Sequence, residues 1–60
     1  MLGWLAVAQT ALNPEGQVLV RGELWRARLT SNDSTVAAGD RVKVLRADGL
    51  ILEVTAVPLG

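Results

Sequence analysis

The sequence predicts a small all-β barrel without substantial helix, and three observations support this prediction. Half of the 60 residues are hydrophobic, and these are chiefly Val, Leu, Ala and Ile, aliphatic types rich in the β-branched residues that strands prefer. Short runs of these residues are separated by Gly, Pro, Asn and Asp, which favour tight turns. The chain is too short for a two-sheet sandwich, so we expect the strands to close into a barrel, because closure removes exposed sheet edges.

The clearest element is a β-hairpin near the carboxyl end of the chain. Asp48-Gly49 lies between two runs of branched apolar residues, and a two-residue Asp-Gly loop favours the type I′ turn of hairpins. With these two residues at the tip, Ala47 is expected to pair with Leu50. Val44 is then expected to lie opposite Glu53 or a near neighbour.

Five strands are expected in all, over residues 2–11, 17–21, 23–30, 41–47 and 50–56. The first is apolar or small on both faces, with Trp4 on one and Leu5 and Val7 on the other, as in a strand covered on two sides. Between the first two strands, Pro14 indicates a type I turn over residues 13–16.

Alternation along the other strands assigns their inner and outer faces. The side chains expected inside the barrel are Val18, Val20, Trp25, Ala27, Leu29, Val42, Val44, Leu52 and Val54. Those expected to face solvent on the last two strands are Arg41, Lys43, Glu53 and Thr55. Unbroken alternation through Gly22 would point Arg26 and Arg28 into the core, so a bulge or tight bend is expected at Gly22.

These features favour a five-stranded OB-fold-like Greek-key barrel over an SH3-like barrel. A long first strand that bends at its small residues can serve both halves of an OB barrel, and the bend at Gly22 suits the same fold. At this length residues 1–60 are expected to form a single domain.

Composition also limits the function. Six acidic and six basic residues give a net charge of zero, so no overall field attracts nucleic acid or an anionic membrane. The chain has no Cys and no His, so neither a disulfide nor a metal or other cofactor is expected. No two carboxylates are spaced to converge on one cleft, so we expect no catalytic residue and no enzyme activity. The longest apolar stretch, residues 2–8, is too short to span a bilayer.

Four spaced blocks of the sequence match a known pattern. They are Ala8-x-Thr10-x-Leu12-x-Pro14-x-Gly16-x-Val18, Gly22-Glu23-x-Trp25-x-Ala27, Ala38-Gly39-Asp40-x-Val42-x-Val44 and Gly49-Leu50-x-Leu52-x-Val54. Over residues 6–55 this order resembles the C-terminal soluble domain of the NfeD-like family. The resemblance implies an OB-fold barrel at the end of a membrane protein, sometimes beside a serine-protease domain of the ClpP class, and encoded near stomatin- or flotillin-like membrane proteins.

The same resemblance implies a non-catalytic interaction or regulatory module. Its expected partner is a stomatin- or flotillin-like membrane protein or a membrane protease, and self-association is left open. Membrane attachment is expected through a segment outside this chain. The alternative is a single-stranded nucleic-acid-binding OB domain. That function requires a positive groove with aromatic platforms, whereas this chain has two Trp residues and no excess charge.

Four residues are candidate partner contacts. Trp4 lies near the start of the first strand, where an exposed ring beside Leu2 and Leu5 would mark the docking point of a partner or of the missing membrane segment. Arg21, Arg26 and Arg28 are expected to form a basic stripe on the outer face of the second and third strands, with an ordinary solvated face as the competing interpretation. Trp25, in contrast, is expected to fill the barrel.

Overall fold

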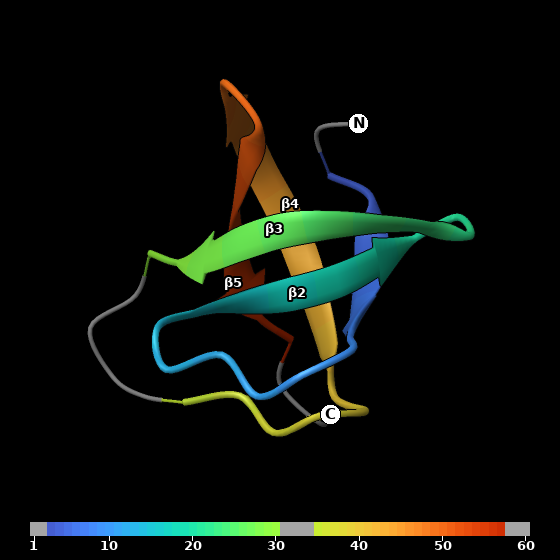
Figure 1. Ribbon diagram of the computed structural model, residues 1–60, viewed down its shortest axis with the longest axis vertical. Coiled ribbons are helices and arrows are strands. Elements are labelled where there is room, and N and C mark those ends of the chain that lie inside the picture. Colours follow the sequence, from blue (N-terminus) through green and yellow to red (C-terminus); the bar gives the residue numbers. More distant parts are fainter. Residues whose placement is uncertain (1–2, 31–34, 58–60) are drawn as a thin grey trace.

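The structure is a computed structural model that describes residues 3–30 and 35–57. Its strands are β1 (Leu5–Ala8), β2 (Glu15–Val20), β3 (Glu23–Leu29), β4 (Arg41–Asp48) and β5 (Ile51–Ala56). They form a closed barrel in the order β1-β2-β3-β5-β4, and β4 pairs back with β1. Only the β3–β5 pair is parallel among these strands. In Figure 1, β2 and β3 lie side by side and cross in front of β4. The predicted five-stranded OB-fold-like barrel is confirmed, and the described residues contain no helix.

The barrel interior is filled by aliphatic side chains that alternate along the strands. The buried hydrophobic residues are Ala6, Ala8, Leu12, Val18, Val20, Ala27, Leu29, Val36, Val42, Val44, Leu52 and Val54. This set contains every side chain predicted to lie inside except Trp25, which is half-buried and packs against the same core, as does Trp4. The alternation of the sequence therefore assigns the inner face correctly.

The change of direction at Gly22 is a tight turn between strands. Val20 pairs with Glu23, which leaves Arg21 and Gly22 as the two loop residues, with φ values of 48° and 85°. Two consecutive positive φ angles are the pattern of a type I′ hairpin turn. The expected tight bend is confirmed, and it places Arg26 on the outer face of β3.

The β4–β5 hairpin forms, but its predicted tip is wrong by one residue. The loop is Gly49–Leu50, because Asp48 still belongs to the ladder, and Ala47 pairs with Leu52 instead of Leu50. Gly49 has a φ of 64°, and Leu50 is not among the residues with positive φ. The observed turn needs a positive φ only at its first loop residue, which is Gly49. The predicted type I′ turn over Asp48 and Gly49 would also impose a positive φ on Asp48.

A β-bulge in β4 changes the faces of the residues that follow it. Val44 pairs with Val54, but the next pair is Arg46 with Glu53, so Leu45 is an extra residue on β4. The expected position of Val44 opposite a near neighbour of Glu53 is confirmed. Without the bulge, strict alternation would turn Arg46 inward; with it, Arg46 lies outside, opposite Glu53.

The first strand is shorter than predicted: of the expected residues 2–11, Leu2 lies outside the described residues, and β1 covers Leu5–Ala8. The N–H groups of Gln9 and Thr10 both donate to the carbonyl oxygen of Gln17, at 2.8 and 3.3 Å. Two consecutive donors on one acceptor interrupt the ladder, and the chain leaves β1 at this point.

The predicted type I turn around Pro14 is also wrong. β2 already begins at Glu15, and the Asn13–Pro14 peptide bond is cis. Gly16 lies within β2, where an added Cβ atom would stand 2.5 Å from the carbonyl oxygen of Ala11. Glycine is thus required here by the close approach of the preceding segment.

Candidate interaction surface

Four exposed hydrophobic side chains adjoin one another on the outside of the barrel. Leu5 and Val7 project from β1, Leu19 from β2 and Leu24 from β3, with exposed fractions of 55, 40, 37 and 53%. Val7 pairs with Leu19, and Leu19 pairs with Leu24, so the four side chains form a continuous row across three strands. We call this row the apolar stripe. Single exposed hydrophobic residues are ordinary, whereas a contiguous group is a candidate interaction surface.

The apolar stripe corrects one expectation from the sequence. The first strand was expected to be covered on both faces because both are apolar. The inner face of β1 is buried, but Leu5 and Val7 on its outer face are exposed. The other described residues cover these two side chains less than the apolar composition of the strand predicts.

Cationic side chains border the apolar stripe on two sides. On β4, Arg41 is the ladder partner of Val7, and Lys43 is the partner of Leu5. On β3, Arg26 follows Leu24 on the same outer face. All three cations are exposed, and within residues 3–30 and 35–57 none of them forms an ion pair.

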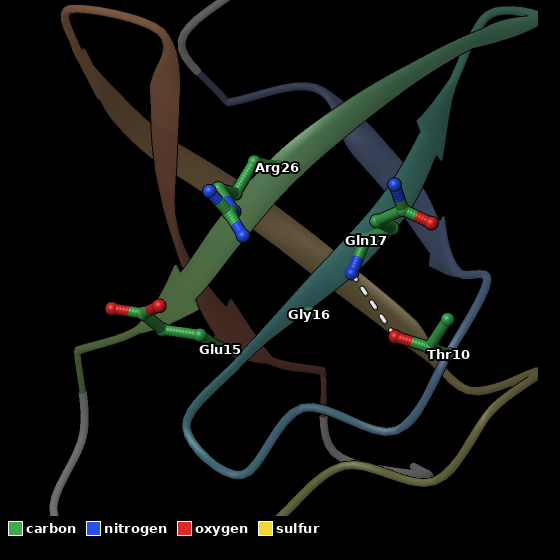
Figure 2. Close-up of a pocket in the computed structure, with 5 residues that line it drawn as sticks. All are labelled: Thr10, Glu15, Gly16, Gln17 and Arg26. Carbon is green, nitrogen blue, oxygen red and sulfur yellow. Dashed lines mark hydrogen bonds between the residues drawn. The ribbon is translucent and has the colours of Figure 1, made fainter.

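Arg26 also lines a shallow polar pocket of about 260 Å³ at the end of the apolar stripe. Figure 2 shows Arg26 and its ladder partner Gln17 projecting from neighbouring strands beside Glu15 and Thr10. The backbone N–H of Gln17 donates to Thr10 Oγ1 at 3.1 Å. Glu15 lines the same pocket without forming an ion pair with Arg26. The pocket thus presents a cation and a carboxylate that a partner could contact.

Two of the predicted contact residues, Trp4 and Arg21, lie against each other. Trp4 is half-buried and packs against the core, and the guanidinium carbon of Arg21 lies 3.7 Å from the centre of its ring. This is a cation–π contact. Arg21 reaches the ring from the β2–β3 turn, so it covers one side of the indole.

Arg28, the fourth predicted contact, belongs to a cross-strand ionic cluster. Its Nη2 atom lies 3.3 Å from Glu53 Oε2, and Arg46 Nε lies 2.8 Å from Glu53 Oε1. The expectation that Glu53 faces solvent is wrong: the residue is only 6% exposed, because β3 and β4 place an arginine over it from each side. The three arginines of the expected stripe therefore have three different surroundings, and among the residues that the structure describes Arg26 forms neither an ion pair nor a cation–π contact. Their role in partner binding stays a prediction.

The cluster determines the ionisation of its carboxylate. The hydrogen bond from Arg46 is the main cause that lowers the pKa of Glu53, and the charges of Arg46 and Arg28 act in the same direction, against the opposing effect of burial. The same hydrogen bond raises the pKa of Arg46. Glu53 therefore stays ionised to a lower pH in the folded protein than in the unfolded chain.

This shift predicts part of the acid response of the barrel. The folded-state pKa of Glu53 lies below the unfolded value of about 4.3, so its stabilising effect is complete above that pH and is lost as the pH falls through the folded value. Glu53→Gln is expected to lower the melting temperature near neutral pH and to weaken its dependence on pH below about 5. Circular dichroism melts across this range measure both effects.

Glu23→Gln is the matched control, because Glu23 is exposed and forms no ion pair among the described residues. Its melts should follow the wild-type curve closely. If Glu53→Gln lost as much stability on acidification as the wild type, the cluster would not be the source of the acid response.

Across residues 3–30 and 35–57, no three carboxylates gather in a way that could hold a metal ion. Over the same residues, we find no helix with the length and apolar character needed to cross a bilayer.

Comparison with known proteins gives consistent matches. The family described as "NfeD-like C-terminal, partner-binding domain" matches residues 1–55. Over 52 residues the chain is 44% identical to a membrane-bound protease of Pyrococcus horikoshii. The aligned region covers 87% of this chain but only 12% of the length of that protein.

Two solved structures share the fold along nearly the whole chain. The C-terminal domain of a stomatin operon partner protein from Pyrococcus horikoshii superposes with a TM-score of 0.88 at 40% identity, covering 97% of this chain and 89% of that one. The soluble domain of a membrane protein implicated in regulation of membrane protease activity from Corynebacterium glutamicum gives 0.83 at 28% identity, covering 93% and 92%. With its closed five-stranded barrel and these matches, the chain belongs to the NfeD-like family and corresponds to its C-terminal, partner-binding domain.

Proposed function

We propose that this domain is a non-catalytic protein-interaction module that binds a protein partner on the apolar stripe. The proposal rests on one observation, the exposed row of Leu5, Val7, Leu19 and Leu24 on the outside of the barrel. The interior of the barrel is already filled by other side chains. The described strands form a closed sheet, so a partner has no free edge to extend by strand addition. A partner is therefore expected to bind through contacts with the outward-pointing side chains.

The relatives supply the context of this module. One is named as a membrane-bound protease, one as a stomatin operon partner, and one as implicated in regulating membrane protease activity. By analogy, the domain works in a membrane protein that regulates a membrane protease or acts with a stomatin- or flotillin-like partner. Its attachment to the membrane lies in a segment outside this chain.

Binding of single-stranded nucleic acid has less support. Nucleic-acid bases stack on accessible aromatic faces inside a positive groove. Trp4 carries Arg21 over its ring, and Trp25 packs half-buried against the core. The net charge of the chain is zero.

The proposal is tested by removing two central side chains of the apolar stripe. Leu19→Ser combined with Leu24→Ser is expected to weaken binding to a purified stomatin-like protein from the same organism by about tenfold or more, because each buried leucine contributes on the order of 1 kcal/mol. Isothermal titration measures the affinity. Circular dichroism verifies that the variant keeps its fold.

Leu45→Ser is the matched control. Leu45 is 41% exposed, similar to Leu19, but it is not a ladder partner of any residue of the apolar stripe. Its binding should equal that of the wild type. Full affinity in the double variant, or an equal loss in the control, would exclude the apolar stripe as the docking surface.

A further inference from the structure

We infer that the segment bound by the apolar stripe has an apolar centre with a carboxylate on each side. This inference rests on the proposed function and adds the chemistry of the partner. It follows from the cations on both sides of the stripe: Arg41 and Lys43 on β4, and Arg26 on β3.

These cations are available to a partner. Each is exposed, and in the part of the chain that the structure describes none forms an ion pair, in contrast to Arg28 and Arg46, which share Glu53. Glu15 is the carboxylate that lines the pocket of Arg26, and it makes no ion pair there. Although the whole chain is neutral, three cations border the apolar stripe against two exposed carboxylates, Glu15 beside Arg26 and Glu23 beside Leu24, so the border is basic by one charge. A partner with carboxylates at these positions would complement this charge and suppress competitors of the opposite sign.

The barrel also sets the spacing of the two carboxylates. From β4 the surface crosses β1 and β2 before it reaches β3, which makes three steps between adjacent strands. At about 4.8 Å per step, these three steps span roughly 14 Å across the strands. Arg26 also lies two ladder positions along the strands from Arg41 and four from Lys43, so the cations stand roughly 16 to 20 Å apart along the surface. An extended segment that crosses the strands obliquely rises about 3.3 Å per residue, so its carboxylates should stand about five to six residues apart with apolar side chains between them.

A second copy of the chain fits this surface less well. In a symmetric dimer the same patch faces itself, so the basic borders of one copy would lie near those of the other. An anionic membrane would satisfy the charges. However, the net charge of the chain is zero, so no overall field attracts the domain to an anionic bilayer. The observations therefore favour an acidic segment of another protein.

A peptide selection tests this inference directly. A display library of random 12-residue peptides is selected on the purified 60-residue chain, and the enriched sequences are measured by fluorescence anisotropy. We expect Asp or Glu on both sides of an apolar centre, with a separation of about five to six residues. Replacing these acids by Asn or Gln should weaken binding by about fivefold or more, and added salt should weaken it further.

Charge variants of the barrel form the second arm. Arg26→Glu and Lys43→Glu should each reduce peptide affinity by about fivefold, and their combination by more. Arg26→Lys and Lys43→Arg, which keep the charge, should bind within about twofold of the wild type. Because both side chains are exposed and free of ion pairs in the described region, these variants should keep the wild-type melting temperature.

The outcomes separate the inference from the proposed function. If binding depends on Leu19 and Leu24 but shows no preference for acids, the inference is wrong and the proposed function stands. If no selected peptide depends on these leucines, both are wrong. Leucine-dependent binding only to vesicles of equal parts phosphatidylglycerol and phosphatidylcholine, or concentration-dependent dimerisation through the same leucines, would also overturn the inference.

Discussion

Replacing Gly16 by alanine is expected to lower the melting temperature of the barrel by about 5 to 20 °C. An added Cβ atom would stand 2.5 Å from the carbonyl oxygen of Ala11, 2.6 Å from Leu12 Cδ2 and 2.6 Å from Thr10 Oγ1. The closest of these atoms belongs to the backbone, so rotation of a side chain cannot relieve the overlap. Overpacking of this kind costs about 1 to 3 kcal/mol, a large part of the stability available to a 60-residue domain.

The direction of the change in stability distinguishes Gly16 from a glycine in an ordinary strand. In an ordinary strand a glycine-to-alanine change stabilises by about 0.4 to 1 kcal/mol, because it restricts the unfolded chain. Gln17→Ala changes the neighbouring exposed side chain and should alter stability by less than about 0.5 kcal/mol. Thermal and urea melts of the two variants compare the sites. A Gly16→Ala protein as stable as the wild type would mean that the segment before β2 can move away from the barrel.

The sequence could predict which side chains point inward, because that assignment depends on local alternation. Val18, Val20, Val42 and Val44 are buried as expected, since each strand keeps a period of two between its turns. The sharp reversal at Gly22 was likewise predictable from the cost of turning arginines into the core.

The register of the strands was harder to predict than which side chains point into the barrel. The bulge at Leu45 and the double donation of Gln9 and Thr10 to Gln17 shift the ladder by one residue at a time. Such shifts depend on how neighbouring strands meet after the barrel closes, and a single strand's pattern carries no signal for them. The one-residue error at the β4–β5 tip has a local origin, because the turn places its positive φ on Gly49 as the first of its two loop residues.

The ionic cluster required knowledge of the topology. Glu53 is buried because Arg28 reaches it across the parallel β3–β5 pair and Arg46 reaches it across the β4–β5 pair. Alternation correctly places Glu53 on the outer side of β5, but outer position and exposure differ once long side chains lie over a small one.

The sequence contains a signal of the apolar stripe, but this signal predicts burial where the structure shows exposure. Leu5 and Val7 make the second face of the first strand apolar, which is expected for a strand buried on both sides. In the barrel that face is exposed and joins Leu19 and Leu24. A strand that is apolar on two faces in a domain with one interior is therefore evidence for a binding surface.

Truncating Leu12 is expected to have the largest effect on stability of the changes considered. Leu12 lies outside the five strands, yet it is completely buried, and its backbone exchanges two hydrogen bonds with Val36, at 2.8 and 3.1 Å. Leu12→Ala removes core side-chain volume and leaves a cavity, which costs about 2 to 5 kcal/mol. In a domain whose total stability is only a few kcal/mol, this loss should leave much of the protein unfolded at about 25 °C.

Two companion variants make this result interpretable even if Leu12→Ala does not fold. Leu12→Met nearly conserves the volume and should cost less than about 1.5 kcal/mol, giving a folded protein with a measurable melt. Leu50→Ala makes the same truncation at a side chain that is 83% exposed, where a change within about 0.5 kcal/mol is expected. If Leu12→Ala melted within a few degrees of Leu50→Ala, the buried Leu12 side chain would contribute little to the stability of the barrel. The segment between β1 and β2 would then be only weakly coupled to the core.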